Sequence, residues 1–75
     1  MDLTKKESQS KQRIEEIKMM IAENFKMKRK LDVKTFANLY CFKNGVSKRT
    51  FAEYLDIALT LAGGRLQGGF IVEND

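Results

Sequence analysis

Two short stretches of the chain follow the same pattern, and this pattern fixes where two consecutive helices begin. In each stretch an apolar residue precedes a polar residue with a good capping side chain, and an aromatic residue follows four positions after the cap. The first consists of Leu31–Asp32 with Phe36, and the second of Val46–Ser47 with Phe51. A capping oxygen accepts hydrogen bonds from the free N–H groups of a helix start, and the two apolar side chains pack together across it. The sequence therefore predicts two helices separated by a tight turn.

Apolar residues at helical spacing predict three helices in all, the third of them central and packed on the other two. The first is expected to span about residues 10–27. The second follows Asp32 and ends at Lys43–Gly45, where a left-handed residue is expected to stop it, and the third follows Ser47 and ends at Gly63–Gly64. Their predicted core faces consist, in chain order, of Ile14, Ile17, Ile21 and Phe25, of Val33, Phe36, Ala37, Tyr40 and Cys41, and of Phe51, Leu55, Ala58, Leu59 and Ala62, widened by Tyr54, Ile57 and Leu61.

The chain ends in a pattern typical of a short β-hairpin. Residues 65–73 form two stretches with a period of two, and Gly68–Gly69 between them supplies positive φ at both turn positions. A hairpin this short is not stable alone, so we expect it to pack on the helices through Leu66, Phe70 or Val72. The predicted fold class is α+β, mostly α, with three helices and a short C-terminal β-hairpin.

The length of 75 residues allows one small domain. Residues 1–9 are polar and lack apolar periodicity, so we expect them to form a flexible tail and residues 10–75 to form the domain. A chain this short buries a modest core and is marginally stable without further support. Association into a homodimer or a larger protein complex would supply that support.

The residue types present exclude several kinds of protein. Cys41 is the single cysteine, which fits a reducing compartment such as the cytoplasm, including the nucleoid. The sequence has no histidine, so the usual ligand of a structural zinc site and the usual base for a serine or cysteine nucleophile are missing. No apolar run approaches the roughly 18 residues that cross a bilayer. We therefore predict a protein that is not an enzyme and has no cofactor, membrane segment or small-molecule substrate.

Positive charge is concentrated in the middle of the chain. Residues 26–49 contain eight lysines and arginines against Asp32 alone, for a net charge of +7, whereas the whole chain carries +4. Residues 1–25 are neutral and residues 50–75 carry −3. Such a block is the electrostatic pattern expected of a protein that binds a polyanion. The alternative is a lysine-rich surface that is merely solvated.

Three helices with a tight turn between the last two, followed by a glycine-punctuated hairpin, resemble the winged helix-turn-helix family over residues 10–73. The resemblance is clearest at Val46–Leu55, where an apolar residue, a serine cap, two basic residues, a threonine and a phenylalanine follow in the order typical of the start of a recognition helix. It implies a duplex-DNA-binding protein, such as a transcriptional regulator. The recognition helix would lie near residues 47–62, beside the basic patch of residues 26–49.

Candidate DNA contacts follow from this resemblance together with the charge pattern. Arg49 is the candidate for reading bases, because its forked guanidinium matches O6 and N7 of guanine. Lys48 is expected to bind phosphate, and in this family the hairpin tip often touches the minor groove or the backbone. The complete set of candidate DNA-binding residues is Lys28, Arg29, Lys30, Lys34, Lys43, Asn44, Ser47, Lys48, Arg49, Arg65 and Gln67.

Two features of the sequence favour a different partner. The outward stripe of the third helix is expected to consist of Arg49, Glu53, Asp56 and Thr60. Two carboxylates on this face would repel phosphates, although Glu53 would then either pair with Arg49 at i, i+4 or accept a hydrogen bond from cytosine. The hairpin also has a single basic residue, Arg65. The alternative hypothesis is a non-catalytic interaction or scaffold subunit of a larger nucleic-acid-processing complex.

Overall fold

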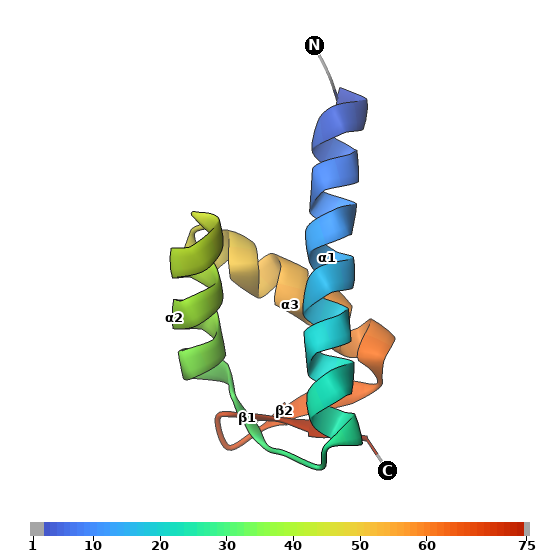
Figure 1. The fold of residues 1–75 in the computed structure, drawn as a ribbon, viewed down its shortest axis with the longest axis vertical. Coiled ribbons are helices and arrows are strands. Elements are labelled where there is room, and N and C mark those ends of the chain that lie inside the picture. The colour runs from blue at the N-terminus through green and yellow to red at the C-terminus, as the bar shows by residue number, and fades with distance from the viewer. Residues whose placement is uncertain (1–2, 75) are drawn as a thin grey trace.

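The fold is known from a computed structural model that describes the backbone of residues 3–74 and the side chains of residues 9–74. The predicted fold class is confirmed, because three helices and an antiparallel hairpin make up an α+β fold that is mostly α (Figure 1). The elements in chain order are α1 (Leu3–Lys26), β1 (Leu31–Asp32), α2 (Val33–Asn44), α3 (Lys48–Ala62), β2 (Gly64–Gln67) and β3 (Phe70–Glu73).

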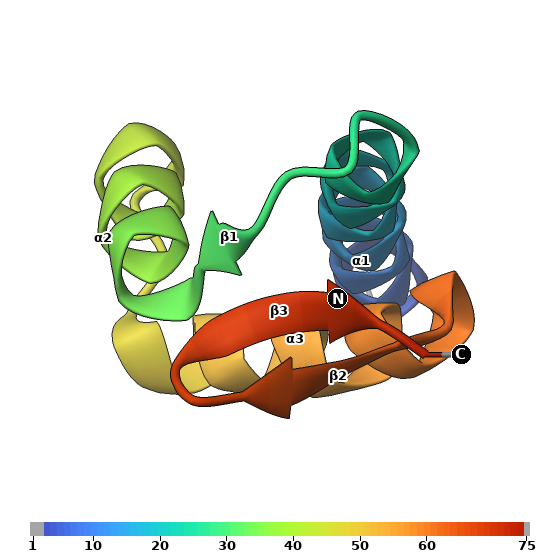
Figure 2. The same ribbon diagram turned by 90° about the horizontal axis from the view of Figure 1, so that it is seen from below.

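Helix α3 is central, as predicted. In Figure 1, α1 runs down one side of the molecule, α2 rises on the other side, and α3 crosses behind both. Helix α3 packs against α1 and α2, whereas α1 and α2 hardly touch each other. The sheet closes the lower end, and Figure 2 shows the hairpin lying along α3 with its turn toward the α2 side.

Helix α1 is longer than the apolar pattern predicts. It begins at Leu3 and not near residue 10, so the segment 3–9, which was expected to lie in a flexible tail, is helical. The reason is that lysine, glutamate and glutamine have high helix propensity and no glycine or proline interrupts them. The first two residues of the predicted tail lie outside the described residues.

Both predicted N-terminal caps form. Asp32 Oδ1 accepts hydrogen bonds from the backbone N–H groups of Lys34 and Thr35 at 2.9 and 3.1 Å. Ser47 Oγ accepts a hydrogen bond from the backbone N–H of Thr50 at 3.1 Å. These bonds satisfy donors that have no partner within the helix and fix the first residues of α2 and α3.

The flanks of these helices also match the predicted pattern. Leu31 and Val46, the apolar residues before the two caps, are partly buried and pack against the core. The predicted helix stops at Gly45 and Gly63 are confirmed, because both residues adopt the left-handed conformation after the last helical residue. The turn between α2 and α3 is therefore only a few residues long.

Aromatic rings from α2 and α3 form the centre of the core. The Phe51 ring lies 5.3 Å from both the Phe36 ring and the Tyr40 ring, centroid to centroid, and is nearly perpendicular to Phe36. Such edge-on contacts stabilise a core beyond the apolar area that they bury. The buried apolar residues are Ile17, Ile21, Phe36, Tyr40, Phe51, Leu55, Ala58, Leu59 and Ile71.

The core face of α3 is narrower than predicted. Ile57 and Leu61, which were expected to widen it, are 48% and 60% exposed, and Tyr54 is only partly buried. Phe51, Leu55, Ala58 and Leu59 are buried, whereas the flank of α3 with Ile57 and Leu61 is open to solvent. The remaining predicted core residues are buried or partly buried.

The hairpin packs on the helices through a residue that the sequence pattern did not single out. Ile71 of β3 is fully buried, whereas Leu66 and Phe70 are 54% and 37% exposed and Val72 is partly buried. Side chains alternate across a strand, so Ile71 faces the helices while Phe70 faces away. The expectation that Leu66, Phe70 or Val72 makes the main contact is therefore wrong.

Strand β1 joins the hairpin to form a three-stranded antiparallel sheet with the order β1-β3-β2. Leu31 pairs with Ile71 from one side and Leu66 pairs with it from the other. Strand β1 was not predicted, because two residues are too few for an alternating pattern. Gly68 and Gly69 have φ values of 58° and 82°, which confirms the predicted two-residue turn.

The chain leaves α3 by passing tightly between two core side chains. A Cβ atom on Gly64 would lie 2.6 Å from Phe25 Cζ and 2.9 Å from Leu59 Cδ1. Only glycine allows the backbone to approach α1 and α3 this closely. The start of β2 is thus packed directly on the interface between these helices.

We expect Phe51→Ala to lower the free energy of unfolding by about 3–5 kcal/mol, because a buried aromatic ring is replaced by a cavity. This loss approaches the whole stability of a small domain. Thermal denaturation followed by circular dichroism measures it. Leu61→Ala, at an exposed position of the same helix, is the control and should change the midpoint by a few degrees at most. An unchanged melt for Phe51→Ala would contradict the core described here.

The Tyr40 hydroxyl gives the core a dependence on alkaline pH. It is buried without a hydrogen-bond partner among the described residues. Burial raises its pKa above the ordinary value of 10.0, the nearby carboxylate of Glu16 adds to the rise, and Arg13 opposes it. Because the folded state favours the neutral phenol, we expect stability to be full below pH 10 and to fall as the pH rises through the folded pKa. Urea denaturation of Tyr40→Phe should show a smaller alkaline loss, whereas Tyr54→Phe should keep the wild-type loss.

Candidate nucleic-acid interface

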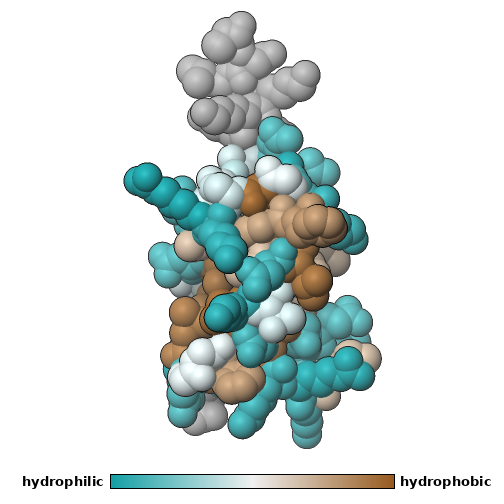
Figure 3. Space-filling view, turned by 90° about the vertical axis from the view of Figure 1, so that its left-hand side faces the viewer, coloured by the Kyte–Doolittle hydropathy of each residue, from teal (hydrophilic) through white to brown (hydrophobic). Residues whose placement is uncertain are grey.

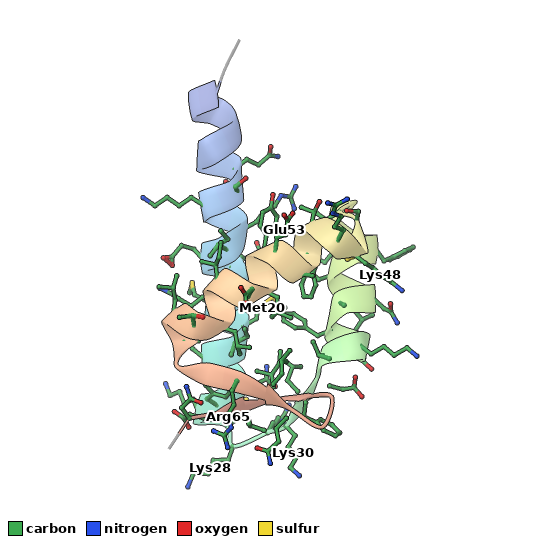
Figure 4. All side chains as sticks on the ribbon, turned by 180° about the vertical axis from the view of Figure 1, so that it is seen from behind. Met20, Lys28, Lys30, Lys48, Glu53 and Arg65 are labelled. Atoms are coloured by element: carbon green, nitrogen blue, oxygen red, sulfur yellow. The ribbon has the colours of Figure 1, made fainter. Side chains whose placement is uncertain are left out.

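The candidate cations fall into two groups at different ends of α2. The hairpin-end group lies around the sheet and consists of Lys28, Arg29, Lys30, Lys34 and Arg65. The turn group lies around the connection between α2 and α3 and consists of Lys43, Lys48 and Arg49. Figure 4 shows Lys28, Lys30 and Arg65 at the sheet end of the molecule and Lys48 at the opposite end of α2. The candidate residues therefore do not form one continuous cluster.

Lys28 occupies a backbone position that usually requires glycine. Its φ is 56°, in the left-handed region. Its N–H donates to the carbonyl of Phe25 and the N–H of Arg29 donates to the carbonyl of Asn24, both at 2.9 Å. These are the two hydrogen bonds that close a helix at a left-handed residue. The basic segment Lys26–Lys30 contains no glycine, so nothing in the sequence marked this position.

Two other members of the hairpin-end group, Lys30 and Arg65, interact with residues of the hairpin. Lys30 Nζ lies 5.8 Å above the ring centroid of Phe70, close enough for a cation–π interaction. The Arg65 guanidinium donates to the carbonyl of Glu73, to Asn74 Oδ1 and to Gln67 Oε1. Arg65 and Gln67 are thus bonded to each other and tie β2 to the end of β3, although both side chains remain exposed.

The first turns of α2 and α3 carry positive charge. Lys34 lies in the first turn of α2, Lys48 and Arg49 lie in the first turn of α3, and all three are exposed. Neither of these first turns contains an acidic residue. The N-terminus of a helix already carries a partial positive charge, so cations there are locally unfavourable.

Two candidate residues of the turn region, Asn44 and Ser47, make hydrogen bonds within the fold, and a third, Lys43, lies beside a groove. Lys43 lines a groove between α1 and α2, and Arg49 is not among the residues that line it. The Asn44 amide donates to the carbonyl of Tyr40 at 3.0 Å. Ser47 Oγ, besides capping α3, donates to Thr50 Oγ1 at 3.0 Å.

The basic residues of segment 26–49 are not neutralised within the described part of the chain. Among the side chains of residues 9–74, an ion pair forms between Lys18 and Glu15 at 2.8 Å, but no acidic side chain pairs with a cation of this segment. The pair between Arg49 and Glu53, one of the two alternatives for Glu53, is therefore absent among the described side chains. Glu53 and Asp56 are both exposed, so the carboxylates of the outward stripe of α3 stay open to solvent.

Comparison of the chain with models of protein families, with curated proteins and with solved structures found no match. No helix within residues 3–74 is both long and apolar enough to cross a membrane. The partner of the candidate interface is therefore inferred from the charge and the shape of the interface.

The conformation of Lys28 is testable by substitution. Lys28→Gly should raise the free energy of unfolding by about 0.5–1 kcal/mol, because glycine adopts the left-handed conformation without steric cost. Lys26→Gly removes the same charge within the helix and should lower it by about 1 kcal/mol. Urea denaturation distinguishes the two variants. A loss of stability in Lys28→Gly would show that Lys28 is not left-handed.

Proposed function

We propose that this chain is a small winged-helix protein that binds duplex DNA, chiefly through the phosphate backbone. The observation that carries the proposal is the presence of lysine or arginine where the local backbone disfavours them. These positions are Lys28, Lys34, Lys48 and Arg49. A neutral residue at Lys34, Lys48 or Arg49, or a glycine at Lys28, would make the isolated chain more stable.

The local cost of these cations is appreciable for a small domain. A non-glycine residue in the left-handed conformation costs roughly 1–2 kcal/mol. A cation in the first turn of a helix costs about 0.3–1 kcal/mol through the helix dipole. An anion at the same place reverses the sign, because the dipole, the free N–H groups and the cations then all attract it. A polyphosphate backbone is an anion long enough to reach several such positions at once.

The order of the elements supports a winged-helix type of contact. The tight turn between α2 and α3 and the glycine-punctuated hairpin are the features on which the family resemblance depends, and both occur in the fold. In this arrangement the first turn of α3, with Lys48 and Arg49, approaches the major groove, and the hairpin approaches the neighbouring backbone.

The carboxylates of α3 limit how many bases of the DNA this helix can contact. Arg49 is placed to reach a guanine edge, but Glu53 and Asp56 follow it on the outward stripe and repel phosphates on either side of the groove. We therefore assign base reading to Arg49 alone and most of the affinity to phosphate contacts. A role as a transcriptional regulator depends on the discrimination that Arg49 supplies.

A non-catalytic scaffold subunit is the second candidate function. The observation that favours it is the surface of α3, where exposed Glu53 and Asp56 lie near exposed Ile57 and Leu61. A mixed acidic and apolar surface suits a protein partner better than DNA.

Duplex titrations at two salt concentrations test the DNA-binding proposal. Lys34→Ala should weaken binding to all duplexes alike and reduce the slope of log Kd against log salt by about one, because one phosphate contact is lost. The same variant should be as stable as the wild type or slightly more stable. Lys11→Ala, an exposed lysine of α1 outside the basic segment, is the charge-matched control and should leave binding unchanged.

Arg49→Ala separates base reading from phosphate binding. It should reduce the discrimination between a preferred site and random duplex by about 1–3 kcal/mol. If it behaves as Lys34→Ala does, α3 does not read bases and the binding is non-specific. If the wild-type protein binds no duplex at low salt, the DNA proposal is wrong and the scaffold function takes its place.

A further inference from the structure

A groove of about 500 Å³ lies between α1 and α2, because these helices hardly touch each other. Apolar side chains form most of its lining, and a carboxylate from α1 and an ammonium group from α2 lie among them. The apolar lining consists of Met20, Leu31, Phe36, Leu39 and Tyr40, and the charged lining consists of Glu16 and Lys43.

The apolar surface of the groove continues onto the outer side of α2. Leu39 is 65% exposed, and Phe42, three residues further along the same helix, is 90% exposed. On the α1 side, Met20 is 42% exposed. Figure 3, which looks onto the α2 side of the molecule, shows apolar patches between charged side chains. An exposed phenylalanine beside an apolar groove is typical of an interaction surface.

We propose that this face pairs with a second copy of the same chain, so that Leu39 and Phe42 of each copy enter the groove of the other. In such a two-fold pair each contact occurs twice, because the same surface is used by both copies. Each copy supplies both parts of the contact, a groove and an apolar side chain beside it. The pairing goes beyond the proposed DNA binding and does not depend on it.

The charges of the two walls favour a second copy over other occupants. Glu16 and Glu23 are exposed on the α1 side, and Lys43 is exposed on the α2 side. When α2 of one copy lies along α1 of the other, Lys43 approaches the carboxylates of the other copy, and the symmetric contact forms at the same time. The face is therefore complementary to itself, whereas the carboxylates on the α1 wall repel nucleic acid.

The molar mass in solution, measured by light scattering on a sizing column over a range of concentrations, tests the pairing. The wild-type chain should have the mass of a dimer at high concentration. Phe42→Glu should raise the dissociation constant roughly tenfold or more, because a carboxylate replaces an apolar anchor. Leu61→Glu, which makes the same change at an exposed position of α3, should leave the mass unchanged. Circular dichroism of both variants verifies that the fold is retained.

Exchanging the charges of Glu16 and Lys43 tests whether this face forms the contact between the two copies. Glu16→Lys and Lys43→Glu should each weaken the dimer, and the double variant should restore it, because opposite charges again meet across the contact. A monomeric wild type, a dimer that survives Phe42→Glu, or a double variant weaker than both single variants would each overturn the proposal. A monomer would leave the groove to a helix from a different protein.

Discussion

The contact of Phe51 with Phe36 and Tyr40 joins α2 to α3, which is the central helix because α1 and α2 hardly touch each other. Phe51 lies in the second turn of α3, directly after the capped turn, so the same ring closes the core and fixes the angle between α2 and α3. The position of the two basic first turns relative to each other is a consequence of this contact. The packing of the core thus determines the geometry of the candidate interface.

The core stabilises the fold, whereas several residues of the basic segment lower its stability. Helix caps, left-handed glycines and a packed aromatic centre stabilise the fold, while Lys28, Lys34 and the cations of α3 weaken it locally. Proteins commonly give up local stability where they bind a partner. The uneven distribution of charge is therefore more informative than the net charge, which is modest.

Much of the fold could be predicted from the sequence, because its signals are local. Asp32 and Ser47 begin helices through bonds to residues two or three positions away, and Gly68–Gly69 form a turn through their own dihedral freedom. Features that depend on distant contacts were missed. Strand β1 exists only through its pairing with β3, and Ile71 is buried only because the sheet packs on the helices.

The candidate site was harder to predict for the same reason. Basic residues were easy to find, but their surroundings were not. Lys43 lines the groove between α1 and α2, and Arg65 is bonded to the end of β3, and neither arrangement leaves a trace in the local sequence. The left-handed conformation of Lys28 depends on how α1 ends against the turn that follows it.

Because Gly64 packs closely on Phe25 and Leu59, these two core side chains set the direction in which the hairpin leaves α3. Strand β2 spans four residues from Gly64, a length of about 13 Å. A difference of about 10° in its direction at Gly64 would therefore displace the turn by about 2 Å. For the proposed DNA binding, displacements of this size would decide whether a side chain of the hairpin reaches a phosphate. Changes in the volume of Phe25 or Leu59 would therefore adjust the reach of the hairpin without altering any residue on its surface.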